Sequence, residues 1–164
     1  MQNQVFLILH NIRSLHNVGS IFRTADAAGV SKIFLTGYTP SPRDVFGNFR
    51  KEISKTALGA EKYIPWQKVS NIGGLTRGLT REFGRKKIQV VALEQSKKSI
   101  DYRKLKPRFP VALILGNEVM GLSPALLKKC DKIIEIPMRG KKESLNVAVS
   151  AGVALFKILE NTKN

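Results

Sequence analysis

The chain has 164 residues, 43% of them hydrophobic, so we expect one domain with an ordinary core that spans residues 1–164. No apolar run reaches about 18 residues and the first residues lack a signal-peptide pattern, which excludes a membrane protein and favours a cytoplasmic one. A single cysteine, Cys130, excludes an internal disulfide, and with two histidines it leaves too few ligands for a zinc site, so we expect no metal.

The net charge of +16 is the strongest signal in the composition, because 28 lysines and arginines stand against 12 acidic residues. The basic residues cluster at 43–55, 77–87, 103–108 and 139–142, between apolar runs, where loops and helix faces could meet phosphates. Clusters of this kind favour a polyanionic partner. The alternative is a charged surface that only keeps the protein soluble.

The first part of the chain predicts a strand, a helix and a second strand. The strands are the apolar run Val5–Leu9 and the segment Lys32–Thr36. The helix is expected to begin near Asn17, a favourable N-cap residue, and to end at Gly29. Its apolar stripe, which predicts one buried face, consists of Val18, Ile21, Phe22, Ala25 and Ala28.

Gly19 and Arg23 are four residues apart and lie on one face of this helix, away from the apolar stripe. A glycine at that place leaves room for another backbone or for a ligand. Arg23 would then direct its guanidinium over the same place. On spacing alone, a solvated helix arginine explains Arg23 equally well.

The middle of the chain contains longer connections. Tyr38–Ser54 predicts a polar loop of a length that is usually functional or mobile. Trp66 is interpreted as a core or interface anchor, and Val69–Phe83 as a helix weakened by three glycines. Ile88–Leu93 predicts a strand, and Ser99–Arg108 predicts a basic connection.

A buried strand at Val111–Leu115 stops abruptly at Gly116. Polar residues follow, and then a short helix with Ser123 as its N-cap and Pro124 in its first position. In open α/β sheets, ligands bind outside the carboxyl ends of the strands. We therefore expect a site in the loop after Gly116.

A second buried strand, Ile133–Ile136, stops at Pro137 in the same way and marks a second loop of the expected site. A basic segment then leads to Ser144, the expected N-cap of a final helix at Leu145–Leu159. This helix is apolar on nearly every side, which is typical of a buried helix. In so small a domain, a second subunit is the expected cover.

The alternation of strands and helices predicts an α/β domain with a mostly parallel sheet flanked by helices. The sequence patterns of common phosphate loops and of the nucleophile elbow are absent. Ser144 is therefore interpreted as a cap and hydrogen-bond donor rather than as a nucleophile. Glu118 is either a carboxylate at a helix start or part of the site.

Three longer motifs occur in the chain: N-V-G-S-I-F-R-T-A-D-A-A-G at Asn17–Gly29, L-I-L-G-N-E-V-M-G-L-S at Leu113–Ser123, and I-P-M-R-G-K-K-E-S-L-N-V-A-V-S-A-G at Ile136–Gly152. In order and spacing they resemble the motifs of the SpoU (TrmH-type) RNA 2′-O-ribose methyltransferases of the SPOUT superfamily. The resemblance covers nearly the whole chain. It implies the SPOUT fold, whose C-terminal part is tied into a deep trefoil knot, a rare exception to the rule against knots.

The resemblance also implies S-adenosylmethionine as the cofactor, bound in the knot by backbone groups of three loops. The residues expected to bind it are Leu93, Gly116, Ile136, Met138, Ser144 and Leu145. Their small and apolar character fits a ligand that is held by main chain and packing. A valine at Gly116 is expected to occupy the place of the cofactor.

The implied reaction is methyl transfer to a ribose 2′-hydroxyl of RNA, with Arg23 in the chemical role and Asn17, Glu118, Ser144 and Asn146 as supporting polar residues. Arginine is not normally deprotonated, so we expect Arg23 to orient the hydroxyl and a neighbouring phosphate, with a transient base as the alternative. The residues expected to bind RNA come from the basic clusters: Arg43, Arg50, Lys51, Lys55, Arg139, Lys141 and Lys142.

Two classes of function stay open in the sequence. The first is the enzyme, acting on either tRNA or rRNA. The second is a basic RNA-binding module of the same fold that has lost catalysis. The presence of all five polar site residues favours the enzyme. The resemblance further implies a homodimer with its sites near the interface, so that Arg23 serves either its own site or that of the partner.

Overall fold

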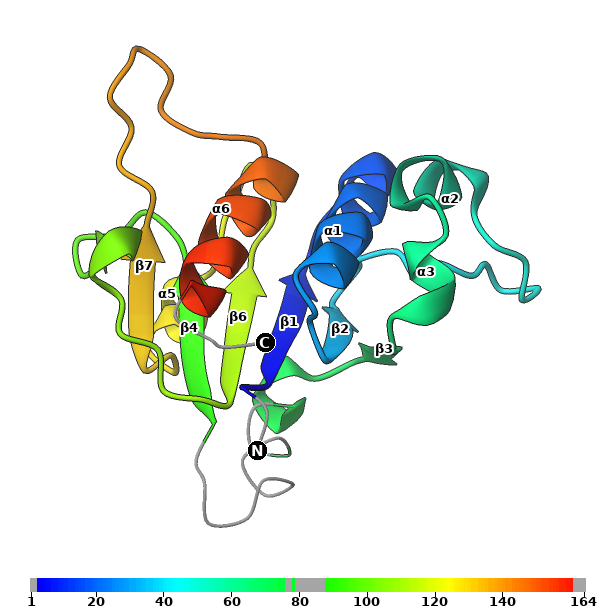
Figure 1. The fold of residues 1–164 in the computed structure, drawn as a ribbon, viewed down its shortest axis with the longest axis horizontal. Coiled ribbons are helices and arrows are strands. Elements are labelled where there is room, and N and C mark those ends of the chain that lie inside the picture. Colours follow the sequence, from blue (N-terminus) through cyan, green and yellow to red (C-terminus); the bar gives the residue numbers. More distant parts are fainter. Residues whose placement is uncertain (1–2, 76–77, 79–87, 161–164) are drawn as a thin grey trace.

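The computed structural model describes residues 3–75, 78 and 88–160 (Figure 1). The strands are β1 Val5–His10, β2 Lys32–Thr36, β3 Trp66–Val69, β4 Gln89–Leu93, β5 Ile100–Asp101, β6 Val111–Leu115 and β7 Lys132–Glu135. The helices are α1 Leu15–Ala27, α2 Lys51–Ala57, α3 Ala60–Tyr63, α5 Pro124–Leu127 and α6 Val147–Leu159, and a 3₁₀ turn covers Tyr102–Lys104. Within the described residues, no helix has the length and apolar character needed to span a membrane.

The strands form one seven-stranded sheet in the order β3-β2-β1-β6-β4-β7-β5, and all pairs are parallel. This confirms the predicted α/β domain with a mostly parallel sheet. The sequence order reverses between β1 and β6, so this pair flanks the switch point where such sheets bind ligands. Leu9 pairs with Leu115 and Leu115 with Leu93, so three central strands end at one level. The trefoil knot stays a prediction.

Helices cover both faces of the sheet. Successive side chains of a strand point to opposite faces, and in the central strands both sets are apolar and need to be buried. In β1, Leu7 and Leu9 pack in a cluster with residues of α1 and α6, whereas Phe6 and Ile8 pack in a second cluster with Leu126 of α5. Figure 1 shows α1 and α6 side by side over one face of the central strands. The N-termini of both helices therefore lie at the carboxyl edge of the sheet.

Two of the predicted helix starts are wrong. Helix α1 begins after Ser14, whose hydroxyl oxygen accepts a hydrogen bond from the Asn17 backbone N–H at 3.2 Å, and not at Asn17. Helix α6 begins after Asn146, whose Oδ1 accepts from the backbone N–H of Ala148 at 2.8 Å, and not at Ser144. Several good N-cap residue types lie near the start of each of these two helices, and packing of the first helical turn decides which of them becomes the cap.

The middle of the chain is more regular than predicted. Helix α2 begins at Lys51, inside the predicted loop, and Trp66 begins the edge strand β3, which pairs with β2. The predicted helix at Val69–Phe83 starts too early, because Val69 ends β3 and the helical residues begin at 72. Residues 72–75 and 78 are helical, and residues 76–77 and 79–83 lie outside the described part of the chain. The basic cluster at 77–87 lies outside it in the same way, apart from residue 78.

Gly19 of α1 lies close against the backbone of α2. A Cβ atom on Gly19 would overlap the hydroxyl oxygen of Thr56 and the carbonyl oxygen of Ile53. The same Thr56 hydroxyl donates to the carbonyl oxygen of His16 at 3.0 Å. Of the two alternatives that the sequence left open, the glycine therefore admits a neighbouring backbone.

Helix α6 is buried on one side only in the single chain. Ala151, Ala154, Leu155 and Ile158 pack into the core, and they define its inner face. Two large apolar side chains on the opposite side stay exposed to solvent, Val149 at 53% and Phe156 at 56%. The prediction of a helix that is covered all round is therefore not met within one chain.

Candidate functional site

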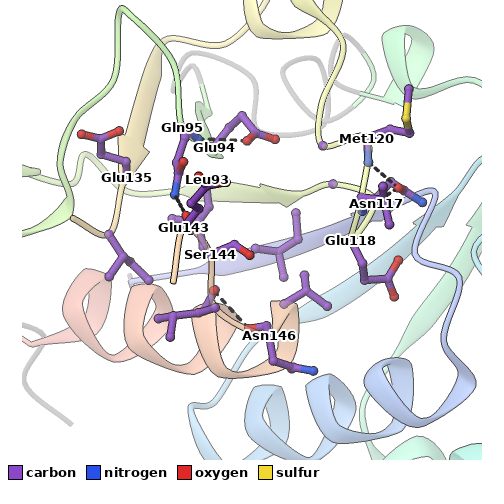
Figure 2. A pocket seen from close by; sticks show the side chains of 18 of the residues that line it. Leu93, Glu94, Gln95, Asn117, Glu118, Met120, Glu135, Glu143, Ser144 and Asn146 are labelled. Atoms are coloured by element: carbon purple, nitrogen blue, oxygen red, sulfur yellow. Dashed lines mark hydrogen bonds between the residues drawn. The ribbon is translucent and has the colours of Figure 1, made fainter. Parts of the chain in front are cut away.

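A cavity of about 620 Å³ opens at the carboxyl edge of the sheet, beside the switch point (Figure 2). Its walls come from the loops that follow β4, β6 and β7, from the start of α6, and from one residue of α1. The lining residues are Asn17, Leu93–Gln95, Leu115–Gly121, Glu135, Ile136, Met138, Glu143–Val147 and Ser150. The two loops selected from the sequence thus form most of one cavity.

All six residues predicted to bind the cofactor line this cavity. Leu93 ends β4, Gly116 follows β6 and Ile136 follows β7, so parallel strands that end together bring these residues together. The other three, Met138, Ser144 and Leu145, come from the segment between β7 and α6.

Gly116 lines the cavity, and a side chain at this position would first meet the chain itself. A Cβ atom on Gly116 would lie 2.7 Å from Leu122 Cγ and 2.8 Å from the carbonyl carbon of Gly121. A side chain at this position would therefore push against the turn that follows β6. The expectation that a valine here occupies the place of the cofactor stays a prediction. The glycine is needed because that turn folds back closely onto the strand end.

Glu118 fastens the loop after β6 to the start of α1. Its Oε2 accepts a hydrogen bond from the Arg13 backbone N–H at 3.0 Å, and its Oε1 accepts from the Ser14 backbone N–H and from the Asn17 side-chain amide, both at 3.1 Å. Burial raises the pKa of the Glu118 carboxyl, but the hydrogen bonds from Arg13, Asn17 and Ser14 outweigh burial and lower it overall. The carboxylate is thereby held in its charged form.

Asn17 connects this carboxylate to the last helix. Its Nδ2 donates to Glu118, and its Oδ1 accepts a hydrogen bond from Asn146 Nδ2 at 3.1 Å. Since Asn146 Oδ1 also caps α6, the amide groups of both asparagines have donors and acceptors in use. Four of the five predicted catalytic residues, Asn17, Glu118, Ser144 and Asn146, therefore line one cavity, and three of them form a hydrogen-bonded chain.

Arg23, the fifth predicted residue, does not line the cavity. It lies six residues after Asn17 on α1, which places it about 9 Å further along the helix axis. Its side chain is exposed to solvent. The structure thus separates Arg23 from the other four predicted residues of the same chain.

Asn117 braces the turn after β6 and was missed as a site residue. Its Oδ1 accepts hydrogen bonds from the backbone N–H groups of Val119 at 2.9 Å and Met120 at 2.7 Å. Its Nδ2 donates to the Asn11 carbonyl oxygen at 3.0 Å and to the Tyr38 hydroxyl oxygen at 2.7 Å. A polar residue directly after a buried strand and a glycine was the available signal.

Two further contacts tie the loops of the cavity to one another. Glu94, after β4, accepts a hydrogen bond from the Leu122 backbone N–H at 2.8 Å. Gln95 Nε2 donates to the Glu143 carbonyl oxygen at 2.6 Å. Since the partners of each pair are far apart in the sequence, their spacing gave no indication of either contact.

The cavity is acidic in a strongly basic protein. Four of its lining residues are glutamates, Glu94, Glu118, Glu135 and Glu143, and none of its described lining residues is a lysine or arginine. The cavity therefore favours a ligand with positive charge.

The residues predicted to bind RNA lie outside the cavity in two groups. Figure 1 shows the segment 40–50 and the segment 136–146 at opposite ends of the long axis of the molecule. The first group surrounds the start of α2, and the second lies in the loop between β7 and α6, where Lys142 borders a smaller adjoining hollow of about 470 Å³. In the part of the chain that the structure describes, no group of three or more histidine, cysteine or carboxylate side chains is placed to hold a metal ion.

Comparison with known proteins gives one consistent group. The profile of the SpoU rRNA methylase family matches residues 4–156. The protein YacO of Bacillus subtilis (strain 168), named for the TrmH family of tRNA/rRNA methyltransferases, is 37% identical over 153 residues, which are 93% of this chain and 57% of YacO. The 23S rRNA (guanosine-2′-O-)-methyltransferase RlmB of Haemophilus influenzae is 34% identical over 158 residues, 96% of this chain and 60% of RlmB.

Solved structures agree with the sequence comparison. The crystal structure of an AdoMet-bound rRNA methyltransferase from Sinorhizobium meliloti superposes with a TM-score of 0.86 at 33% identity, over 100% of this chain and 59% of that one. The chain thus spans less than two thirds of the length of these similar proteins.

Proposed function

The chain belongs to the SpoU rRNA methylase family, and from this premise we propose that it is an S-adenosylmethionine-dependent methyltransferase that acts on a ribose 2′-hydroxyl of structured RNA, either tRNA or rRNA. One observation carries the proposal: the same cavity is lined by all six predicted cofactor residues and by four of the predicted catalytic residues, Asn17, Glu118, Ser144 and Asn146. A cytoplasmic location, where such RNA is found, is part of the proposal.

The charge and the lining residues of the cavity fit this cofactor. S-adenosylmethionine supplies a methyl group on a positively charged sulfur, and it carries an ammonium group as well. Four glutamates and no lysine or arginine among the described lining residues match those charges. Leu93, Gly116, Ile136, Met138, Ser144 and Leu145 would hold the cofactor by main chain and packing.

The polar residues of the cavity have separate positioning roles. Glu118 has a lowered pKa because its carboxylate accepts three hydrogen bonds, so it is a poor proton acceptor and serves to hold Asn17 and the start of α1 in place. Asn17 and Asn146 fix α1 against α6, and Ser144 offers a hydroxyl beside them. Arg23 orients the ribose hydroxyl and a neighbouring phosphate.

We further propose a homodimer in which Arg23 completes the site of the partner subunit. The exposed residues Val149 and Phe156 lie seven apart on α6, with Val153 between them, and so form one apolar stripe. Pairing of identical surfaces is the commonest way to cover such a stripe. The position of Arg23 outside the cavity of its own chain supports a role across the interface.

A direct experiment measures cofactor binding and methyl transfer separately. Calorimetry with S-adenosylmethionine tests the cavity, and transfer of a radiolabelled methyl group to unmodified tRNA and rRNA tests the reaction. Arg23→Ala should abolish transfer and leave cofactor affinity nearly intact. Binding of RNA by the wild type without any methyl transfer would instead support the non-catalytic RNA-binding module.

Mixed dimers test which subunit supplies Arg23. The variants Arg23→Ala and Asn146→Ser damage different parts of the site, and serine keeps the N-cap of α6. If Arg23 acts across the interface, a mixture of the two inactive variants should regain about a quarter of the wild-type rate, since half of the dimers are mixed and each has one intact site. A mixture that stays inactive, or a protein that light scattering shows to be an active monomer, would contradict the shared site.

A further inference from the structure

The segment between β2 and α2 exposes two large apolar side chains at its tip. Phe46 is 85% exposed and its neighbour Val45 is 89% exposed. A single exposed apolar residue needs no explanation. Two adjacent ones at the end of a projecting segment place an aromatic ring in solvent, where only a partner could cover it.

The turn that carries Phe46 is rigidly built rather than loose. Asp44 Oδ1 accepts hydrogen bonds from the backbone N–H groups of Phe46 and Asn48, both at 2.9 Å. The Asp44 N–H donates to the Asn48 carbonyl oxygen at 2.9 Å, and the Gly47 N–H donates to the Asp44 carbonyl oxygen at 3.1 Å. Gly47 has a φ of +85°, which glycine adopts readily. The ring of Phe46 is therefore presented on a fixed backbone.

Positive charge surrounds the base of this turn. The guanidinium of Arg43 lies 4.0 Å from the centre of the Phe49 ring and donates to the Gly47 carbonyl oxygen at 2.6 Å. Lys62 Nζ lies 5.5 Å from the same ring. Asp44 is the acidic residue of the turn, and its Oδ1 accepts hydrogen bonds from two backbone N–H groups. The surface around Phe46 thus matches an anionic partner.

The segment also begins at the wall of the cavity. The Tyr38 hydroxyl oxygen accepts a hydrogen bond from Asn117 Nδ2 at 2.7 Å, and the Tyr38 N–H donates to Asn11 Oδ1 at 3.2 Å. Asn117 lines the cavity, so the segment is fixed to the cavity wall near its beginning, at its second residue. The segment that carries Phe46 is thereby connected to the wall of the cavity.

We infer that Phe46 is a base-stacking residue: its ring stacks on an unpaired base of the RNA substrate, while the basic residues at the base of the turn meet the phosphates. The inference rests on the proposed function and adds to it a side chain that binds a base of the RNA outside the cavity. An RNA is favoured over a protein partner because an exposed aromatic ring framed by cations matches the faces of bases and the charges of a phosphate backbone.

The test compares two labelled RNA strands of equal length by fluorescence anisotropy, a single-stranded oligonucleotide with all its bases and an abasic one with the same ribose-phosphate backbone. Phe46→Ala should weaken binding of the strand with bases by about 5- to 150-fold and leave binding of the abasic strand unchanged. Phe46→Trp should keep the affinity, because tryptophan also presents a flat ring. Tyr63→Ala removes a comparably exposed aromatic side chain outside the turn, 77% exposed, and should have no effect on either strand.

Other outcomes separate this inference from the proposed function. Equal affinity of Phe46→Ala and wild type for the strand with bases would overturn the stacking role alone, and so would an equal loss for both strands. A loss of dimer mass in light scattering of Phe46→Ala would show that the tip contacts a second copy of the chain and would overturn the inference as well. A wild type that binds neither strand would overturn both the inference and the RNA substrate.

Discussion

The side-chain amide of Asn146 donates a hydrogen bond to Asn17 Oδ1 over 3.1 Å, which joins two residues that are 129 positions apart in the chain. Asn17 in turn donates to Glu118, so α6, α1 and the loop after β6 meet at one amide group. Substitutions of Asn17 therefore test how strongly these hydrogen bonds hold the walls of the cavity together.

Replacement of Asn17 by alanine should remove both contacts and lower the free energy of unfolding by about 1–3 kcal/mol, because partly buried partners lose their hydrogen bonds. Asn17→Asp should be worse, since it places a second carboxylate beside Glu118. Urea denaturation at neutral pH measures both variants. An aspartate variant as stable as the alanine variant would contradict the close contact with Glu118.

Glu118 predicts a dependence of stability on pH. Because hydrogen bonds lower the pKa of its carboxyl below the ordinary value of 4.5, its contribution to stability is fully present above that value and is lost as the pH falls through the lower folded-state pKa. The difference in unfolding free energy between wild type and Glu118→Gln should therefore be largest at neutral pH and shrink as the pH falls below 4.5. Urea titrations over this range measure it, and a difference that is constant with pH would count against the charged, hydrogen-bonded carboxylate.

The sequence predicted the sheet and the composition of the cavity better than its inner geometry. Buried apolar runs that stop at a glycine or at a polar segment are strong local signals, so the strands that end at Leu93, before Glu94, and at Leu115, before Gly116, were predicted correctly. Which of two nearby polar residues caps a helix depends on tertiary packing, and so Ser14 was missed. The family resemblance supplied the polar residues, but not the partner that each one contacts.

Gly116 illustrates the same limit, because the sequence indicates that a side chain is excluded but not what excludes it. A Cβ atom at this position would lie 2.7 Å from Leu122 Cγ. Gly116→Ala should therefore destabilise the fold by about 1–3 kcal/mol through overpacking, and it should weaken cofactor binding only through the displaced turn. Leu122→Ala removes the side-chain atoms in the way but leaves the Gly121 carbonyl carbon at 2.8 Å, so a double-mutant cycle should show a partial rescue, with a favourable coupling of about 0.5–3 kcal/mol. Strict additivity of the two losses would show that Leu122 is not the obstacle.

Two helical glycines should respond to alanine in opposite ways. At Gly19 the new methyl group would overlap Thr56 and the backbone of Ile53, so Gly19→Ala should force α1 and α2 apart and lower the free energy of unfolding by about 1–3 kcal/mol. At Gly152 the new methyl group would meet Thr24 Cγ2 at 3.5 Å, an ordinary contact, and alanine is the better helix former. Gly152→Ala should therefore raise the stability by about 0.5–1 kcal/mol. Chemical denaturation of both variants checks the pair, and a Gly19→Ala variant as stable as Gly152→Ala would show that the two helices do not pack backbone to backbone at Gly19.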